Sequence, residues 1–374
     1  MQAQRTTFTP SDLEVVPAVN ALLGQLGVGR LETEEVESLF GRNENWAGTT
    51  STGAGVFVKR VSLDGGPEDA ALRMARSRSF AALVTGLASP DLATPELIGY
   101  DEESRVLVFR LLEGARTFAE LAADDDLDAG LAARAGRATG LLHRLDAGKA
   151  HPPLDDAPFP FPNLGLLRAL PMAGFLGLTF AEVTLWGILH GDAELAAALA
   201  RLRAAEEAAP RVPAHCDLRF DQFLLVDGVL HLTDGEEFRA SDAARDIGSL
   251  AGEWLYRAVT GIVGRGSGDE PDVLTVHEPT HEEIVARGVR EMDRVRPLIR
   301  AFWSAYRSVR TTDDPGLAAR ATAFAGWHMI DRAMATAARG SRLPAVTRAA
   351  MGIGRTALLA PQNFVGALGL EENR

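Results

Sequence analysis

The sequence predicts an α+β protein with a small mixed β-sheet in its N-terminal part and a larger, mainly helical C-terminal part. Strand-like patterns and glycine turns are concentrated in the first third of the chain. From Thr117 onward the chain is rich in Ala, Leu and Arg, and most segments have helical periodicity. The exception is one short apolar hairpin within residues 215–238. We therefore expect two lobes, residues 1–112 and 113–374, with the hairpin in the second lobe.

The elements of the first lobe follow from local patterns. Ser11 and Glu14 have the spacing of a capping box, which predicts a helix that runs to about Leu26. A second helix is expected from about Pro67 to Leu87. The expected strands lie in residues 34–40, 43–51, 56–61 and 105–114.

The second lobe is predicted to be a set of helices interrupted by irregular segments. The expected helices cover residues 127–146, 193–209, 243–260, 282–309, 316–339 and 343–359. Residues 150–180 contain six prolines and should form an irregular insertion. Residues 264–272 have the composition of a mobile loop.

Composition excludes several classes of protein. The 374 residues carry a formal net charge of -13, which argues against a basic surface for nucleic acid. The only cysteine is Cys216, so no disulfide can form within the chain and a reducing compartment is expected. No apolar run is long enough to span a membrane, and the first ten residues lack a signal-peptide pattern. We expect a soluble, cytoplasmic protein.

The hairpin brings two acidic residues together. Phe223–Val226 is an apolar run, Asp227-Gly228 favours a two-residue turn, and the chain returns over the next five residues. A tight hairpin joins its outer ends, so Asp217 and Asp234 should lie side by side. Two neighbouring carboxylates repel unless a cation, a proton or hydrogen-bond donors separate them. The pattern therefore predicts a metal-assisted site.

The same stretch resembles the catalytic segment of the aminoglycoside phosphotransferase and choline kinase-like families. Their usual pattern is His-Gly-Asp, four residues, Asn, a hairpin and Ile-Asp. In this chain it is His215-Cys-Asp217, four residues, Gln222, the hairpin and Thr233-Asp234. The downstream segment "SDAARDIGSL" resembles the Gly-Asp-Pro…Asp-Leu-Ala segment of these families, which places Asp242 and Asp246 as structural acids. The resemblance implies a bilobal protein-kinase-like fold.

The resemblance also assigns roles to the residues of the hairpin region. It implies that Asp217 is the catalytic base or orients the hydroxyl, and that Asp234 binds Mg²⁺. Gln222 replaces the usual Asn, so its amide oxygen remains a candidate metal ligand on a longer side chain. His215 and Arg219 are further candidate catalytic residues, although a surface ion pair would equally explain Arg219. The implied cofactors are ATP and Mg²⁺.

The nucleotide site is expected in the first lobe. Lys59 matches the strand lysine that pairs with nucleotide phosphates, and Phe57 shares its face and is a candidate for the adenine pocket. The segment 111–114 matches the hinge, and Arg110 and Leu112 are counted with it as candidate nucleotide-binding residues. The glutamate that usually holds the strand lysine has no counterpart in "LRMARSRSFAAL". Either Glu68 or Asp69 replaces it, or the lysine is oriented differently.

Three other motifs have simpler explanations. "HGD" at 190–192 precedes a helical run without a hairpin, so Asp192 is expected to be a helix cap. "HEPTH" at 277–281 matches the zinc-protease motif His-Glu-x-x-His. That motif needs a helix, and Pro279 disfavours a helix there. We expect Thr280 and Glu283 to cap the following helix instead. "ADDDLDAG" lacks the distant glutamate of a calcium loop and reads as a solvated turn.

Three functions follow from these patterns. The first is an ATP- and Mg²⁺-dependent phosphotransferase that acts on a hydroxyl. The segment "HCDLRFDQFLL" resembles the kinase-like components of class V lanthipeptide and thioamitide pathways. This resemblance implies phosphorylation of Ser or Thr in a ribosomal precursor peptide. It also implies a separate lyase protein as partner. The second is a small-molecule kinase for aminoglycosides or amino alcohols, and the third is a non-catalytic kinase-like scaffold. A metalloprotease is a more distant alternative.

Overall fold

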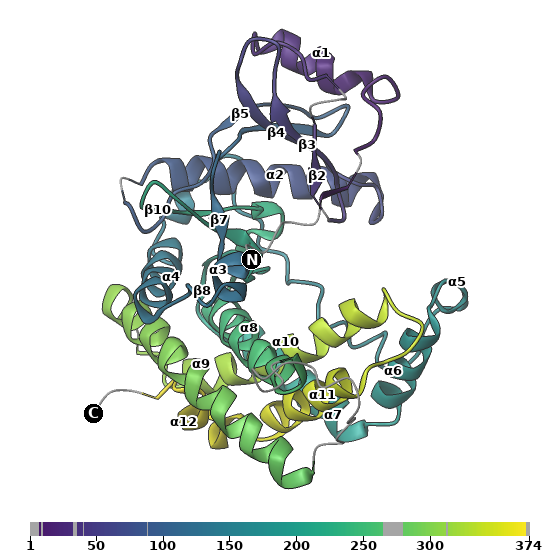
Figure 1. Ribbon diagram of the computed structural model, residues 1–374, viewed down its shortest axis with the longest axis vertical. Coiled ribbons are helices and arrows are strands. Elements are labelled where there is room, and N and C mark those ends of the chain that lie inside the picture. Colours follow the sequence, from purple (N-terminus) through teal and green to yellow (C-terminus); the bar gives the residue numbers. More distant parts are fainter. Residues whose placement is uncertain are drawn as a thin grey trace, which may run out of the picture. The chain divides into compact units, whose positions relative to one another are not determined.

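The computed structural model describes residues 7–8, 10–32, 36–39, 41–87, 89–264, 280–311 and 313–371. The chain divides into two compact units (Figure 1). Unit 1 contains Met1–Asp128, Leu141–Ala157 and Val212–Ala240. Unit 2 contains Ala129–Gly140, Pro158–Arg211 and Ser241–Arg374. The hairpin packs with the N-terminal part in unit 1, whereas the expected lobe boundary at residues 112 and 113 stays a prediction.

The largest sheet of unit 1 is antiparallel and has the strand order β3-β4-β6-β5. Its strands are β3 (Glu44–Thr49), β4 (Gly55–Arg60), β5 (Leu97–Asp101) and β6 (Val106–Arg110). Alternation along β4 puts Val56 and Val58 on one face, where they share a core with Trp46 and the helix α1 (Pro17–Gln25). Phe57 and Lys59 therefore face the opposite side of the sheet.

The face with Phe57 and Lys59 is the one that the helix α2 (Gly66–Thr85) covers. Ala70 and Met74 of α2 form a core with Leu107, which pairs with Lys59 across the strands. This helix is where a kinase-like chain would carry the acid for Lys59. Its buried charged residues are instead two arginines, Arg73 and Arg76.

The predicted hairpin is confirmed. It consists of β9 (Phe223–Val226) and β10 (Val229–Leu232), with Val226 paired to Val229 across a two-residue turn. The strand β7 (Arg116–Thr117) extends it to the sheet order β10-β9-β7. Thr117 then begins the short helix α3 (Phe118–Ala123) with a capping box, and Phe118 stacks on Phe223. The hairpin is therefore anchored to the rest of unit 1 on its outer side.

Unit 2 is mainly helical, as the composition predicts. Its helices, with their bounds, are α4 (Ala129–Leu142), α5 (Met172–Leu176), α6 (Phe180–His190), α7 (Ala193–Ala208), α8 (Ala243–Gly264), α9 (His281–Val309), α10 (Leu317–Ala337), α11 (Ala345–Leu359) and α12 (Val365–Leu368). Two residues at the end of α4 belong to unit 1. All six expected helices are present, and their ends lie within a few residues of the expected positions. The remaining strands are β1 (Thr7–Phe8) with β2 (Ser38–Leu39), and β8 (Arg211–Ala214) with β11 (Arg239–Asp242).

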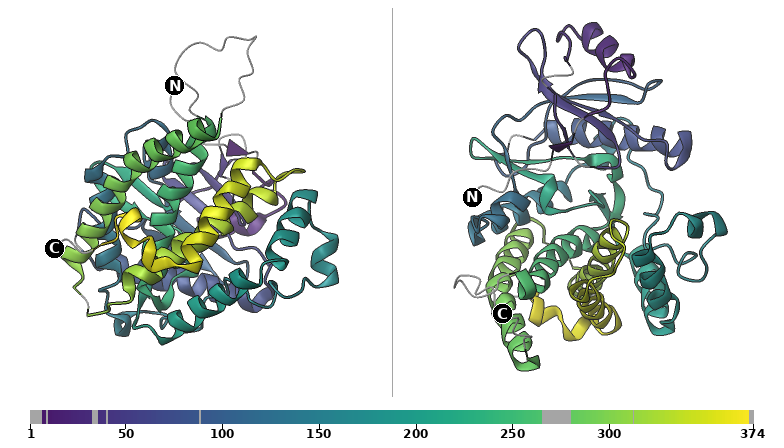
Figure 2. Two further views of the ribbon diagram at one scale, coloured as in Figure 1. Left: turned by 90° about the horizontal axis from the view of Figure 1, so that it is seen from below. Right: turned by 45° about the vertical axis from the view of Figure 1, so that its right-hand side comes forward.

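The centre of unit 2 is the contact of α10 with α8 and α11 (Figures 1 and 2). Glycines permit a close approach of the helices. A methyl group on Gly248 of α8 would lie 2.4 Å from the backbone oxygen of Ala321, and one on Gly326 of α10 would lie 2.5 Å from that of Gly354. Such contacts need backbones that nearly touch, so these glycines are required by packing.

Some sequence expectations need correction. The first helix begins at Pro17, a residue favoured in the first helical turn, and not at the Ser11 capping box. Ser11 instead donates to Glu44, and Asp12 accepts from the backbone of Glu14. The sequence patterns do not predict the strands β1, β5, β7, β8 and β11 or the helices α3, α5, α6 and α12. The predicted mobile loop lies outside the described residues, except for Gly264, and no helix in the described part of the chain is long and apolar enough to cross a membrane.

Candidate active site

The turn of the hairpin sets the geometry of its open end. Asp227 and Gly228 have φ values of 49° and 73°, as a type I′ turn requires. At the open end, the backbone oxygen of Gln222 accepts from the amide of Thr233 at 3.0 Å. The buried His215 donates from Nε2 to the backbone oxygen of Thr233 at 2.8 Å. The loop with Asp217 is thereby tied to the residue that precedes Asp234.

Asp234 occupies a sharp bend immediately after the hairpin. Its backbone is left-handed, with φ 61° and ψ 51°, a region that Asp tolerates better than most residues. The next residue is Gly235, where a Cβ atom would lie 2.4 Å from the ring of Phe80 on α2. The bend turns the carboxylate of Asp234 toward β4, where Lys59 Nζ donates to Oδ1. This contact joins two residues that are 175 positions apart in the chain.

Glu236, which no sequence motif identifies, is a second carboxylate at Lys59. Its Oε2 lies 2.8 Å from Lys59 Nζ. Arg42 Nη2 donates to Oε1 at 2.6 Å, and Asn43 Nδ2 donates to Oε2 at 2.8 Å. Only 5% of Glu236 is exposed. Buried polar groups in folded proteins are nearly always hydrogen-bonded, and these three donors satisfy the buried carboxylate of Glu236.

The ion pairs fix the charge state of both partners. Burial opposes the charged form of Lys59, but Asp234 and Glu236 outweigh it and raise the pKa of Lys59. Burial likewise opposes the charged form of Glu236, but Lys59 and Arg42 outweigh it and lower the pKa of Glu236 to about 2. At neutral pH the lysine is therefore an ammonium and the glutamate a carboxylate.

Asp217 is held by an arginine from its own loop. Arg219 Nη1 lies 3.0 Å from Asp217 Oδ2, and Arg219 Nε lies 3.0 Å from Asp221 Oδ1. The charge of Asp217, followed by that of Asp221, raises the pKa of Arg219 well above its ordinary value, and the charge of Asp234 adds to this effect. The guanidinium thus lies in the field of the predicted catalytic base, Asp217, and of the predicted metal ligand, Asp234. About a third of the Asp217 side chain is exposed, which leaves it accessible to a substrate.

The two predicted metal ligands fit Mg²⁺ by their chemistry. Asp234 offers a carboxylate whose side chain is 28% exposed. Gln222 offers an amide oxygen, which lies 3.4 Å from Oγ1 of Thr233, the neighbour of Asp234. Hard oxygen donors suit Mg²⁺, which keeps several waters and binds substrate phosphates. In the described residues no group of three or more His, Cys, Asp or Glu side chains could hold a metal.

The remaining nucleotide-site candidates lie on β4, β6 and the segment after β6. Phe57 is half-buried and pairs with Phe109 across the sheet. Arg110 is exposed, and its Nε donates to Glu96 at 2.7 Å, so the described contacts place it in a surface ion pair. The segment after it is tied to β4, because the amide of Leu111 donates to the backbone oxygen of Gly55 at 3.1 Å. Leu112 follows in this segment and is half-buried.

Neither acid proposed to replace the missing helix glutamate contacts Lys59 in the described structure. Asp69 accepts from Arg73 Nε at 2.9 Å, and Glu68 is exposed. The side chain of Arg73 is fully buried, and it also donates to Asn43. Arg76 pairs with Asp155 at 2.6 Å. The helix next to Lys59 therefore presents cations toward the acids that follow the hairpin.

The helix caps expected at Asp192 and at Thr280 with Glu283 are confirmed. Asp192 caps α7 by accepting from the amide of Leu195 at 3.0 Å. Thr280 and Glu283 form a capping box at the start of α9. His277, Glu278 and Pro279 lie outside the described residues. Within unit 2, the buried Asp242 pairs with Arg320 at 2.7 Å, and Asp246 is fully buried.

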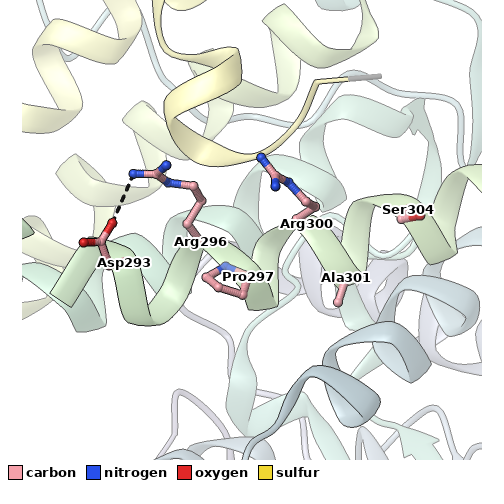
Figure 3. A pocket seen from close by; sticks show the side chains of 6 residues that line it. All are labelled: Asp293, Arg296, Pro297, Arg300, Ala301 and Ser304. Atoms are coloured by element: carbon pink, nitrogen blue, oxygen red, sulfur yellow. Dashed lines mark hydrogen bonds and ion pairs between the residues drawn. The ribbon is translucent and has the colours of Figure 1, made fainter. Parts of the chain in front are cut away.

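A separate hollow of about 490 Å³ lies along α9 (Figure 3). It is lined by Asp293, Arg296, Pro297, Arg300, Ala301 and Ser304. Asp293 and Arg296 form an ion pair at 3.4 Å within it. All of these residues belong to unit 2, and none belongs to the predicted site.

A comparison with protein families identifies the chain as a phosphotransferase. A family model described as "Phosphotransferase enzyme family" matches residues 41–279, which is more than half of the chain. The chain therefore belongs to this phosphotransferase family. A comparison with curated proteins finds no match.

Solved structures show the same kinase-like fold. A choline/ethanolamine kinase family protein from Mesorhizobium loti is 16% identical, with a TM-score of 0.51 over 96% of this chain and 99% of that one. Choline kinase LicA from Streptococcus pneumoniae is 14% identical, with a TM-score of 0.50 over 93% and 99%. Amicoumacin kinase hAmiN, solved with AMP-PNP and Ca²⁺, is 14% identical, with a TM-score of 0.51 over 93% and 96%. These likenesses establish the α+β fold of the chain.

Proposed function

We propose that the chain transfers the terminal phosphoryl group of ATP to a hydroxyl at the site formed by Lys59, Asp217 and Asp234. The observation that carries the proposal is the contact between Lys59 and Asp234, which joins the strand lysine to the end of the hairpin within unit 1. Phosphoryl transfer needs a cation on the phosphates, a carboxylate that orients the attacking hydroxyl and a ligand for the metal. The site contains one residue for each task.

Each residue has a defined part in this mechanism. Asp217 accepts the proton of the attacking hydroxyl, whose oxygen bonds to the terminal phosphorus as the bond to the bridging oxygen of ADP breaks. Mg²⁺ held by Asp234 and Gln222 would neutralise charge on the phosphates. Lys59 pairs with the phosphates, and Arg219 keeps Asp217 in place. His215 is a positioning residue, because its buried ring binds the backbone next to Asp234.

For the acceptor, we propose Ser or Thr of a ribosomal precursor peptide, as in class V lanthipeptide and thioamitide pathways. A separate lyase would then eliminate the phosphate. The resemblance of "HCDLRFDQFLL" to those kinase-like components supports this substrate. Apolar side chains in and after the proline-rich insertion support it too, because such surfaces suit a peptide or protein partner. Met172, Leu176 and Phe180 are 72%, 77% and 74% exposed.

A small amino alcohol or aminoglycoside is the alternative acceptor. Similar structures include choline kinases, which favours this class. The substitution of Gln222 for Asn motivates a further alternative, a scaffold without catalytic activity.

The test is to incubate the protein with ATP, Mg²⁺ and either a Ser/Thr-rich precursor peptide with its lyase or a panel of amino alcohols. Mass spectrometry then reads the products. A phosphate-sized gain or a water-sized loss on the peptide supports the peptide substrate. Transfer only to an amino alcohol would reject the peptide and leave the small-molecule kinase. No transfer together with no nucleotide binding would leave the scaffold.

A further inference from the structure

We infer that Glu236 is the positioning residue for Lys59 and replaces the acid that α2 lacks. The inference rests on the proposed function, because its consequence is the binding of nucleotide phosphates. In kinase-like chains a lysine at this strand position needs an anionic partner besides the metal ligand. Here that partner comes from the short 3₁₀ helix Gly235–Glu237, directly after Asp234.

The need for a second carboxylate follows from the tasks of Asp234. In the structure Lys59 contacts both Asp234 and Glu236. When Asp234 binds a divalent cation, its oxygens are shared with that cation and its hold on the lysine weakens. Glu236 can keep the ammonium in place at that moment. Without it, Lys59 would have Asp234 as its remaining carboxylate partner and would compete with the metal.

The position of Glu236 does not depend on Lys59 alone. Arg42 and Asn43 bind its two oxygens at 2.6 and 2.8 Å, and Arg73 Nη1 of α2 lies 3.9 Å from it. The 3₁₀ helix packs on α2 through Gly235, which contacts Phe80. The expected arrangement has an acid on the helix next to Lys59. Here α2 carries the cation Arg73 instead, and the segment after the hairpin carries the acid Glu236.

The chain offers a matched control for this inference. Glu237 is the next residue, and it also belongs to the 3₁₀ helix. It pairs with Arg239 at 2.7 Å and with Arg42 at 3.1 Å, whereas the described ion pairs of Lys59 are with Asp234 and Glu236. Glu236→Gln and Glu237→Gln make the same chemical change on the same element, and only the first removes a charge from Lys59.

The experiment measures binding of Mg²⁺ and a non-hydrolysable ATP analogue by calorimetry over a series of Mg²⁺ concentrations. For Glu236→Gln we expect affinity to fall about tenfold or more, because a hydrogen bond between charged groups is lost. The Mg²⁺ concentration for half-maximal binding should also rise. For Glu237→Gln we expect the Mg²⁺ dependence of the unmodified protein. The double variant Lys59→Met/Glu236→Gln should bind no more weakly than Lys59→Met alone.

Several outcomes would overturn the inference. An unmodified protein that binds no nucleotide would overturn the proposed function and this inference with it. Normal binding by the unmodified protein and an unchanged Mg²⁺ dependence in Glu236→Gln would overturn this inference alone. If Glu236→Gln does not fold, Arg42→Gln replaces it, because Arg42 is 43% exposed and releases one of the groups that hold Glu236. An unchanged Mg²⁺ dependence in Arg42→Gln would then count against the inference.

Discussion

At the scale of single residues, the proposed function depends on a few charged side chains and on the partners that each of them binds. Asp217 and Asp221 bind the same arginine, yet Asp221 is 56% exposed and Asp217 is 34% exposed. Asp234 and Glu236 bind the same lysine, yet Glu236 is buried among further donors. In each pair the proposed catalytic or metal-binding acid shares its cation with a second acid. In the proposed mechanism, the second acid keeps the cation in place while the first acid binds a substrate or a metal.

Asp217→Asn should abolish phosphoryl transfer and leave nucleotide affinity nearly unchanged. The amide cannot accept the proton of the hydroxyl, whereas the proposed contacts with the nucleotide come from Lys59 and from the metal at Asp234. Transfer is measured with the acceptor that the mass experiment identifies, and affinity by calorimetry. The control is Asp221→Asn, which changes the other acid on Arg219 and should retain most activity. Full activity in Asp217→Asn would show that our assignment of the base is wrong.

Glu236 should also make the stability of the protein dependent on acid. Its pKa is lowered from 4.5 to about 2 in the folded protein, so the unfolded chain takes up the proton first as the pH falls. The stability from this carboxylate is complete above about pH 4.5 and is lost as the pH falls toward about 2. Urea unfolding at a series of pH values should show a shallower loss over this window for Glu236→Gln. Equal slopes for both proteins would contradict the assignment.

At the scale of elements, the close contact between α2 and the bend after the hairpin holds the site together. Gly235→Ala would place a Cβ atom 2.4 Å from the ring of Phe80. Both Gly235 and Phe80 are buried. We expect about 1–3 kcal/mol of destabilisation and weaker nucleotide binding, because the bend must shift. Gly352→Ala is the control, since a methyl group there meets no atom within 4 Å and the residue is exposed in α11. Thermal unfolding compares the two, and equal melting temperatures would contradict the packing role of Gly235.

The sequence predicts the elements that have strong local signals. The hairpin follows from Asp227-Gly228 between apolar runs, and the helices of unit 2 follow from their periodicity. The predicted start of α1 at Ser11 was wrong, because Ser11 makes its hydrogen bond to Glu44 on a strand that is distant in sequence. The strand β5, with the sequence "LIGYD", has too little alternation to be recognised and is held by its partner β6.

The candidate site is predictable only in part for a related reason. The acids at both ends of the hairpin follow from local pattern, whereas the partner of Lys59 depends on tertiary packing. A signal was present, because "DGEEF" adds two acids after Asp234 and α2 has Arg73 and Arg76 where an acid was expected. Acids in one segment and arginines in the other are complementary charges, which favours a contact between the two segments. That signal has meaning only after the hairpin has been placed next to α2.

At the scale of the whole molecule, family membership defines the chain as a phosphotransferase, and the site that we propose for the reaction lies in unit 1. The residues proposed for the reaction, Lys59, Asp217 and Asp234, lie in one compact unit although they are far apart in the chain. The acceptor is not determined by that unit alone. The proposal of a peptide acceptor therefore rests on the sequence of the proposed catalytic loop and on exposed apolar side chains of unit 2.

The measurement that tests the central claim most directly is unfolding in the presence of ATP analogue, with and without Mg²⁺. At a hundred times its dissociation constant, the ligand should raise the free energy of unfolding by about 2.7 kcal/mol. We predict this rise for the unmodified protein with Mg²⁺ and a much smaller one for Asp234→Ala, which lacks the metal ligand. An unchanged free energy of unfolding at millimolar nucleotide with Mg²⁺, or an equal rise in Asp234→Ala, would contradict the proposed site.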